Sequence, residues 1–270
     1  GRVNLEHFAS LLTPRTKMVG FQHVSNVLAA INPVVEMVEM VHSKAHPDVK
    51  IVLDACQSVP HMPVNVQDLG VDFLVASGHK MCAPTGIGFL WGKLDILNAM
   101  PPYQGGGEMI DTVTLEGSTF QPSPARFEAG TPAIAQAVGL GAAIDYLNTI
   151  GMDKIKTYEM ELGQYLYDRL VQVPGLTIFG PSTDRVGLAA FHHESVHPSD
   201  LSTFLDMDGV AIRAGHHCCQ PLHKELGVSH SARASLAFYN SKEYVRFVLK
   251  IGFVFPFSHF HFIQSGMWTS

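Results

Sequence analysis

The stretch Phe73-Leu74-Val75-Ala76-Ser77-Gly78-His79-Lys80 carries an apolar run directly into a lysine. The apolar run predicts a buried strand, and a strand of a buried parallel sheet delivers side chains to the crevice beyond its carboxyl end. Lysine is a poor core residue, so Lys80 is a candidate for a nucleophilic amine that bonds a carbonyl compound. Taken alone, so short a motif is also consistent with an ordinary loop lysine, and this interpretation stays open.

Two earlier apolar runs predict further strands, at residues 17–21 and 50–53, and the opening stretch supplies a third at residues 73–76. Asn32-Pro33 predicts the start of a helix between the first two strands, with asparagine as N-cap and proline in the first turn. This alternation indicates an α/β fold with a mainly parallel sheet. Residues 100–125 are loop-like, and Thr131-Pro132 predicts the N-cap and first turn of the next helix.

The pattern changes at Met152, where a long amphipathic helix is expected to begin. The strands expected after it lie at residues 176–179, 186–191, 210–213 and about 233–236. A helix is expected at residues 198–207, and a further helical start at residues 241–244. We therefore expect a large domain over residues 1–150 and a smaller α+β domain over residues 151–251. Residues 252–270 show neither helical period nor strand alternation, which predicts a disordered tail.

The formal charge of −6, from 18 basic and 24 acidic residues, leaves no basic surplus. Nucleic acid is therefore not an expected partner. The longest apolar stretch, residues 247–263, is interrupted by lysine, proline and histidine, so a membrane span is not expected either. Four cysteines without a regular framework, two of them adjacent, indicate a reducing compartment such as the cytoplasm, or the plastid stroma of a photosynthetic eukaryote.

An aspartate, Asp54, ends the predicted strand that precedes the one carrying Lys80. A pyridine cofactor such as pyridoxal phosphate needs this pair, because the carboxylate keeps the ring nitrogen protonated while the amine bonds the aldehyde and later moves a proton. Ser77 and His79 are then candidates for contacts with the cofactor phosphate. A strand-terminal aspartate also suits the cap of a turn or helix, and this simpler interpretation stays open.

Several motifs in one order make the chain similar to a known family. Residues 53–58, Leu-Asp-Ala-Cys-Gln-Ser, and residues 76–81, Ala-Ser-Gly-His-Lys-Met, resemble class V aminotransferase-fold enzymes, specifically group II cysteine desulfurases and selenocysteine lyases. The similarity runs from Gly1 to about Lys250 and includes the segments at residues 23–26, 84–88, 105–110, 127–132, 213–218 and 233–236. It implies part of the aminotransferase fold of type I, with a mainly parallel sheet in the large domain and a smaller α+β carboxyl-terminal domain.

On the cofactor side, the resemblance implies that Lys80 bonds the aldehyde of pyridoxal phosphate, helped in proton transfer by His79, and that Asp54 pairs with the pyridine nitrogen. The other implied cofactor contacts are Asn26 and Gln57 near the phenolic oxygen, Ser77 and His79 at the phosphate, and Thr131 at the phosphate of a partner subunit. A homodimer is implied by the last of these contacts.

On the substrate side, the resemblance implies that Arg233, with Arg213, binds the substrate carboxylate, a task that suits the planar guanidinium. Cys218 is the implied sulfur acceptor, because a thiolate is the required nucleophile. The implied reaction converts L-cysteine to L-alanine and leaves the sulfur as a persulfide on Cys218, for a sulfur-acceptor protein of iron–sulfur cluster assembly. L-selenocysteine could enter the same route.

Members of this group are longer at the amino terminus, where a phosphate-gripping loop and a ring-stacking histidine lie. Neither element is in this sequence, so we expect an incomplete pocket. Two other hypotheses stay open. In the first, the chain is a non-catalytic fragment that pairs with a full-length partner. In the second, it is another class V enzyme, such as an aminotransferase, an epimerase or a kynureninase-like enzyme, which needs no cysteine at position 218.

The run His216-His217-Cys218-Cys219 has two other interpretations. A metal site is disfavoured, because adjacent ligands seldom fit one tetrahedron and no second cluster has zinc-finger spacing, so we predict no metal. Burial as small apolar residues is the expectation for the other cysteines, Cys56, Cys82 and Cys219. The histidines elsewhere, among them His223, show no spacing that links them to a site.

Overall fold

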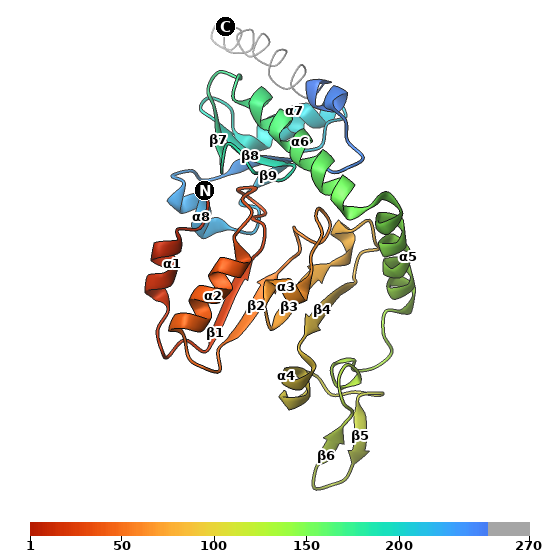
Figure 1. Ribbon diagram of the computed structural model, residues 1–270. Helices are drawn as coiled ribbons and strands as arrows, with labels where there is room; N and C mark the ends of the chain where they lie inside the picture. Colours follow the sequence, from red (N-terminus) through yellow and green to blue (C-terminus); the bar gives the residue numbers. More distant parts are fainter. Residues whose placement is uncertain (248–270) are drawn as a thin grey trace, which may run out of the picture. The chain divides into compact units, whose positions relative to one another are not determined.

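The computed structural model of the chain describes residues 1–247 (Figure 1). The tail predicted over residues 252–270 lies outside the described residues. Two compact units make up the chain: a sheet unit of residues 4–23 and 33–152, and a carboxyl-terminal unit of residues 1–3, 24–32 and the chain from residue 153. Compactness alone does not test independent folding, so the domain boundary near residue 150 stays a prediction.

A four-stranded sheet forms the centre of the sheet unit, in the order β1-β2-β3-β4 (Figure 1). Its strands are β1 (Met18–Gln22), β2 (Lys50–Asp54), β3 (Phe73–Ser77) and β4 (Gly88–Gly92). The first three are parallel, and β4 runs antiparallel to β3. The predicted α/β class with a mainly parallel sheet is therefore confirmed, and the carboxyl ends of β2 and β3 lie side by side, with Asp54 in register with Val75.

Helix α2 (Val34–Lys44) covers this sheet with one apolar side. It buries residues at helical spacing, which share a core with the strand residues Ile51, Leu53 and Leu74; on the helix these are Val34, Val38 and Val41. The expected N-cap, Asn32, was wrong: the helix begins one residue later, and Pro33 holds the N-cap position with a non-helical ψ of 77°. The shorter helices α1 (Leu5–Leu11) and α3 (Val66–Leu69) belong to the same unit.

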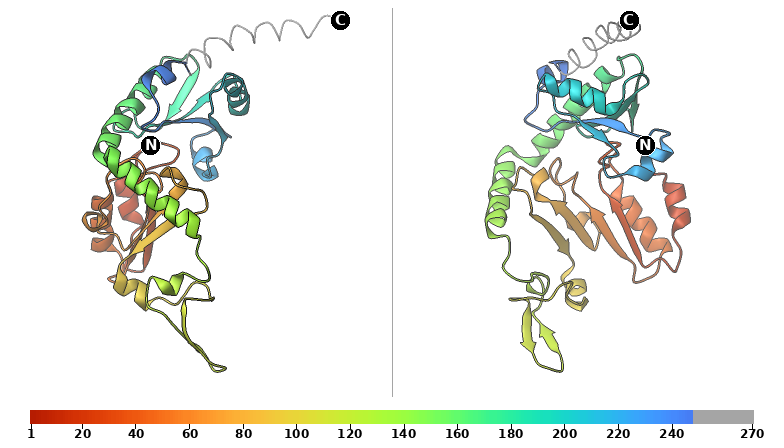
Figure 2. Two further views of the ribbon diagram at one scale, coloured as in Figure 1. Left: turned by 90° about the vertical axis from the view of Figure 1, so that its right-hand side faces the viewer. Right: turned by 180° about the vertical axis from the view of Figure 1, so that it is seen from behind.

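Residues 100–125, expected as a loop, contain a hairpin of two short strands, β5 (Ile110–Val113) and β6 (Ser118–Phe120), which lies apart from the four-stranded sheet (Figure 2). Both strands are almost wholly exposed, so they carry no apolar alternation for the sequence to reveal. Helix α4 (Leu94–Ala99) precedes the hairpin, and the short 3₁₀ turn η2 (Ala125–Phe127) follows it.

Helix α5 (Ile134–Ile150) closes the sheet unit. The predicted cap at Thr131 was wrong, since the N-cap is Ala133 and Pro132 lies outside the helix. Gly139 of this helix faces the loop after Lys80 so closely that a Cβ atom would come within 2.5 Å of Pro84 Cγ. Glycine at this position of α5 therefore lets the neighbouring loop approach the helix closely.

The carboxyl-terminal unit has its own antiparallel sheet, in the order β7-β8-β10-β9. Its elements after the long helix α6 (Met152–Leu170) are β7 (Leu176–Phe179), β8 (Leu188–His193), α7 (Pro198–Met207), β9 (Arg213–Gly215), α8 (Gln220–Glu225) and β10 (Ser231–Ser235), with residues 242–247 helical. Leu162, Leu166 and Leu170 of α6 share a core with Phe191 of β8. The strand expected at residues 210–213 begins only at Arg213.

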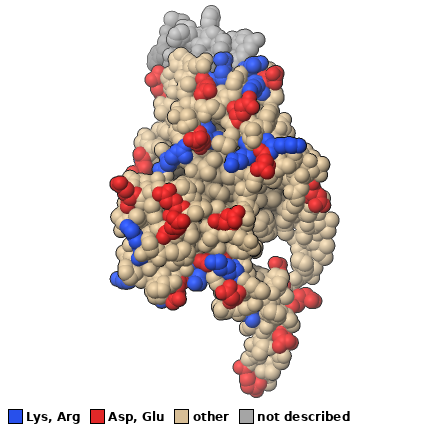
Figure 3. All heavy atoms as spheres, in the orientation of Figure 1, with Lys and Arg blue, Asp and Glu red and all other residues tan. Residues whose placement is uncertain are grey.

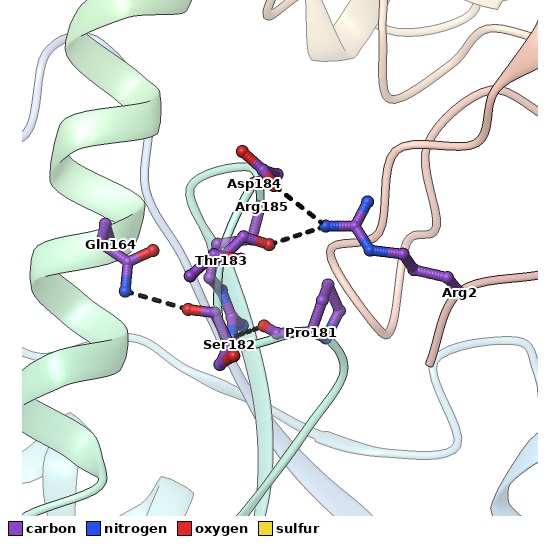
Figure 4. Close-up of polar contacts among 7 residues, drawn as sticks. All are labelled: Arg2, Gln164, Pro181, Ser182, Thr183, Asp184 and Arg185. Atoms are coloured by element: carbon purple, nitrogen blue, oxygen red, sulfur yellow. Dashed lines mark hydrogen bonds and ion pairs between the residues drawn. The ribbon is translucent and has the colours of Figure 1, made fainter.

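A buried arginine fixes the turn before β8 (Figure 4). Arg185 donates from Nη1 to the carbonyl of Pro181 and from Nη2 to that of Leu188, each at 2.8 Å, and its guanidinium lies 4.6 Å from the centre of the Tyr167 ring. Arg2 reaches the same turn through the carbonyl of Thr183 at 3.0 Å. These bonds fasten residues 1–3 to the carboxyl-terminal unit.

On the face drawn in Figure 3, the basic and acidic side chains are interspersed. Among the described helices, none is long and apolar enough to cross a membrane.

Candidate active site

The sheet unit gathers four of the predicted residues at the carboxyl edge of β2 and β3. Asp54 ends β2, Ser77 ends β3, and His79 and Lys80 follow at once in a 3₁₀ turn, η1 (Gly78–Lys80). Asp54 and His79 are exposed, and Ser77 and Lys80 are half-buried. The neighbouring strand ends therefore present a carboxylate, a hydroxyl, an imidazole and an amine to the solvent. The stretch at residues 73–80 predicted such an edge.

Two glycines make the turn at Lys80 possible. The Gly78 N–H donates to the carbonyl of Ile87 at 2.9 Å, and a Cβ atom at Gly78 would lie 2.9 Å from that same oxygen. A Cβ atom at Gly88 would lie 2.6 Å from the carbonyl oxygen of Ala76. Since Cβ atoms do not approach backbone so closely, glycine at both positions lets the loop close over β3 and fixes the direction in which Lys80 leaves the sheet.

The polar groups at this edge are linked to one another. Ser77 Oγ lies 3.0 Å from His79 Nδ1, and Asp54 Oδ1 accepts a hydrogen bond from the Cys56 N–H at 2.9 Å. Burial, the hydrogen bond with Asp54 and the charge of that carboxylate raise the pKa of Cys56 to about 11, while the Lys80 ammonium opposes the rise. The charges of Asp54 and Lys80 therefore both act on the Cys56 sulfur, which stays a protonated thiol at neutral pH.

The donor set at this edge suits a ring with a basic nitrogen, an aldehyde and a phosphate. A carboxylate pairs with a protonated ring nitrogen, an amine bonds an aldehyde, and a hydroxyl with an imidazole binds phosphate. Gln57 lies half-buried in the turn after Asp54, and Thr131 is exposed ahead of α5. Asn26 belongs to the carboxyl-terminal unit, where its side-chain amide donates to the carbonyl of His217 at 2.8 Å.

Two arginines stand side by side in the carboxyl-terminal unit. Arg213 of β9 and Arg233 of β10 are directly opposite in the antiparallel register, where like charges repel. Burial and the charge of Arg213 lower the pKa of Arg233, while Cys218 opposes this shift. Arg233 donates from Nη1 to the carbonyl of Asn26 at 3.0 Å, but its Nε is buried without a hydrogen-bond partner. An anion bound here offsets the repulsion between the two guanidinium groups and accepts a hydrogen bond from the unpaired Nε–H of Arg233.

Cys218 lies exposed beside this pair, and Arg213 Nη2 is 3.8 Å from its sulfur. The Cys218 loop (residues 216–219) has two consecutive residues with left-handed backbone, His217 at a φ of 52° and Cys218 at 59°. Non-glycine residues adopt this conformation only where their surroundings enforce it. A cavity of about 490 Å³ adjoins the loop and is lined by residues that include Arg213, Cys218 and Cys219.

The structure corrects one expectation about the cysteines and adds residues that the sequence did not reveal. Cys82 is exposed, contrary to its expected burial, while Cys56 and Cys219 are half-buried. Within residues 1–247, no group of three or more His, Cys, Asp or Glu side chains is arranged to hold a metal ion. His223 and Ser231, to which no role was assigned, are buried beneath the Cys218 loop. Their spacing of eight residues gave no signal, because the contact depends on how α8 and β10 pack.

Two features define the class of protein. One is the mainly parallel sheet with a lysine turn at its edge, and the other is the separate unit with an arginine pair and a cysteine loop. The aminotransferase class-V family matches residues 1–248, and the chain belongs to that family.

Known relatives narrow the comparison. A probable cysteine desulfurase of Synechocystis sp. is 52% identical over 250 residues, which are 92% of this chain and 59% of that protein. A cysteine desulfurase of Haloferax volcanii is 52% identical over 246 residues, which are 91% of this chain and 57% of the relative. The chain thus spans less than two thirds of the length of these relatives.

Solved structures show the same fold. The cysteine desulfurase CsdA (S-sulfonic acid) from Escherichia coli superposes with a TM-score of 0.87 at 36% identity, over 92% of this chain and 61% of that one. A variant of the enzyme C-DES, solved with glycine covalently linked to its PLP cofactor, superposes with a TM-score of 0.80 over 93% of this chain and 64% of that one. At 20% identity, this second structure supports the fold alone.

Proposed function

We propose that the chain is the greater part of a pyridoxal phosphate-dependent cysteine desulfurase, which converts L-cysteine to L-alanine and holds the released sulfur on Cys218. Membership of the class-V family and the similarity to relatives named cysteine desulfurase support this proposal. The observation that carries it is the exposed Cys218 sulfur 3.8 Å from Arg213 and beside Arg233. An aminotransferase or epimerase of the same fold has no use for a thiol at that place.

Pyridoxal phosphate, when bound, supplies the electron sink for bond breaking at the substrate carbon. In our proposal Lys80 anchors its aldehyde and afterwards moves a proton to and from the substrate carbon, with His79 beside it. Asp54 holds the proton on the ring nitrogen, and Ser77 and His79, already 3.0 Å apart, bind the phosphate. Gln57 and Asn26 contact the phenolic oxygen.

The arginine pair orients the substrate by its carboxylate, and the vacant Nε of Arg233 supports this role. The Cys218 thiolate then attacks the substrate sulfur. An S–S bond forms while the C–S bond breaks, and protonation of the carbon yields L-alanine. The sulfur remains on Cys218 as a persulfide, and L-selenocysteine fits the same steps because only the attacked atom differs.

The proposal includes two protein partners. The first is a sulfur-acceptor protein of iron–sulfur cluster assembly, for which the exposed position of Cys218 is suited. The second is another copy of the chain in a homodimer, with Thr131 of one subunit contacting the phosphate bound by the other. Thr131 is exposed, as such a contact requires before assembly.

Two variants of the chain test the function. Purified chain mixed with pyridoxal phosphate is expected to gain visible absorbance from cofactor bonded to Lys80 and to release sulfide from L-cysteine with a reductant present. Lys80→Ala should lose both signals. Cys218→Ala should keep the absorbance and lose sulfide release by at least a hundredfold, because the nucleophile is gone.

The outcomes separate the hypotheses. Full sulfide release from Cys218→Ala would refute the persulfide role. Absorbance together with turnover of another amino acid, without sulfide release, would indicate a different class V enzyme. Absence of the absorbance in the intact chain, together with co-elution of the chain with a full-length relative on size-exclusion chromatography, would favour a non-catalytic pairing module.

A further inference from the structure

A buried hydrogen-bond network lies directly beneath the Cys218 loop. His217 of the loop, His223 of α8 and Ser231 of β10 are each at most 1% exposed. Ser231 Oγ lies 2.9 Å from His217 Nε2 and 2.8 Å from His223 Nε2, so one hydroxyl joins two imidazole rings. His223 Nδ1 lies 2.9 Å from the carbonyl oxygen of Cys219.

The carbonyl of Cys219 sets the direction of every hydrogen bond in the network. A carbonyl oxygen only accepts, so His223 Nδ1 must carry a proton. In neutral His223, Nε2 is then a lone pair that accepts from Ser231. A serine hydroxyl has a single proton, so Ser231 Oγ must accept from His217, whose proton therefore lies on Nε2.

The second nitrogen of His217 agrees with this assignment. Its Nδ1 is buried without a hydrogen-bond partner, and a bare lone pair there is less unfavourable than an unpaired N–H next to positive groups. Burial, followed by the charges of Arg233, His223 and Arg213, lowers the pKa of His217 to about 4, so the ring is neutral. The remaining titratable groups around the network are His216, His230, His197 and Lys224.

This arrangement holds the two residues that flank Cys218. The carbonyl of His217 accepts from Asn26 at 2.8 Å, the ring of His217 donates to Ser231, and the carbonyl of Cys219 accepts from His223. Cys218, between the two held residues, has the left-handed φ of 59° that its surroundings must enforce. Removing the hydroxyl takes one hydrogen bond from each ring at once.

We propose that Ser231 is the positioning residue of the Cys218 loop: its single hydroxyl joins His217 to His223 and thereby keeps the Cys218 sulfur beside Arg213. The purpose of this positioning, sulfur transfer, rests on the proposed function. The positioning itself is a property of the folded chain and is measurable without turnover.

The tautomers give the first test, in the full 270-residue chain labelled with ¹⁵N-histidine. Signals are assigned with His217→Gln and His223→Gln. At pH 7.5 we expect the NMR spectrum to show His217 protonated on Nε2 and His223 protonated on Nδ1. Protonation of His223 on Nε2 alone would overturn the proposal, because His223 would then have no proton on Nδ1 to donate to the carbonyl of Cys219 and would not hold the loop.

The reactivity of Cys218 gives the second test. Iodoacetamide alkylation of Cys218 is measured by peptide mass spectrometry against that of Cys82, an exposed thiol of the sheet unit that serves as an internal reference. Ser231→Ala should lower the Cys218 to Cys82 ratio at least threefold, because the sulfur is then no longer held 3.8 Å from the Arg213 guanidinium. Ser231→Thr keeps the hydroxyl and should restore the ratio to within twofold.

The matched control is Ser58→Ala. Ser58 is also fully buried, but its hydroxyl donates to the carbonyl of Ala55 within its own turn. An equal ratio in Ser231→Ala and Ser58→Ala would sink the proposal. If the threonine does not fold, His223→Gln replaces it, since its amide oxygen can still accept from Ser231 and should likewise keep the ratio within twofold, whereas His223→Leu should not.

Sulfide release, measured on the same samples, separates this inference from the proposed function. A wild-type chain that releases no sulfide, while Ser231→Ala still lowers the alkylation ratio, contradicts the function and keeps the positioning role. A wild-type chain that releases sulfide, with an unchanged ratio in Ser231→Ala, contradicts the positioning role and keeps the function.

Discussion

At the scale of single residues, the pair Arg213 and Arg233 is the feature that most strongly indicates an anionic ligand. Arg213 and Arg233 repel each other in the free protein, and the buried Nε of Arg233 lacks a partner. Both features are unfavourable for stability alone, and both are relieved by a carboxylate. The sequence supplied the two positions, but their direct opposition became visible only when β9 and β10 were paired.

Arg233→Lys tests whether the fork of the guanidinium matters beyond its charge. The lysine keeps the charge but loses the donor geometry, so for the proposed desulfuration we expect the KM for L-cysteine to rise about tenfold to a hundredfold, with a much smaller fall in kcat. Arg246→Lys is the control, since Arg246 is exposed and donates to Tyr165 OH. Equal KM values in the two variants would refute a carboxylate contact at Arg233.

At the scale of elements, the lysine turn depends on backbone closeness more than on any side chain. Gly78 and Gly88 lie against carbonyl oxygens of the neighbouring segments, and η1 exists because those approaches are possible. The turn is therefore a stability determinant as well as the support of Lys80.

Gly78→Ala should destabilise the chain by about 1–3 kcal/mol, because the added Cβ overlaps the Ile87 carbonyl oxygen. Gly141→Ala is the matched change within α5, where a Cβ meets nothing within 4 Å, and should raise stability by about 0.5–1 kcal/mol through helix propensity. Urea unfolding followed by circular dichroism measures both. A Gly78→Ala variant as stable as Gly141→Ala would contradict the close approach.

The elements also show why some features were predictable and others not. The strands β2 and β3, which have buried residues, carry strong apolar patterns, and so does α7, whose expected bounds are those observed. The exposed β5–β6 hairpin carries none, and the caps of α2 and α5 failed because a favourable Asn-Pro or Thr-Pro pair does not by itself begin a helix. Likewise, Asp54 and Lys80 follow from strand order, whereas the link between His223 and Ser231 depends on tertiary packing.

At the scale of the whole molecule, the two units have separate cores but interleaved chain segments. Residues 1–3 and 24–32 belong to the carboxyl-terminal unit, although they precede or interrupt the sheet unit. Asn26 and Arg2 thus reach His217 and the turn at residues 183–184 from distant sequence. Cutting the chain near residue 150 would remove both contacts, so a fragment from residue 151 onward would lack one support of the Cys218 loop.

Stability of the carboxyl-terminal unit should fall in mild acid, because His217 is buried and neutral. Its pKa is about 4 in the folded chain against 6.5 ordinarily, so between these values the unfolded chain binds more protons and unfolding becomes easier as pH falls. At pH 5 most of this effect is present, and we expect the free energy of unfolding to be about 2 kcal/mol lower than at pH 7 from this residue. His217→Gln removes the titrating group and should flatten the pH dependence by that amount, whereas His42→Gln, at an exposed position on α2, should not. Urea unfolding at the two pH values decides the matter, and an unchanged slope in His217→Gln would mean that His217 does not carry the acid sensitivity.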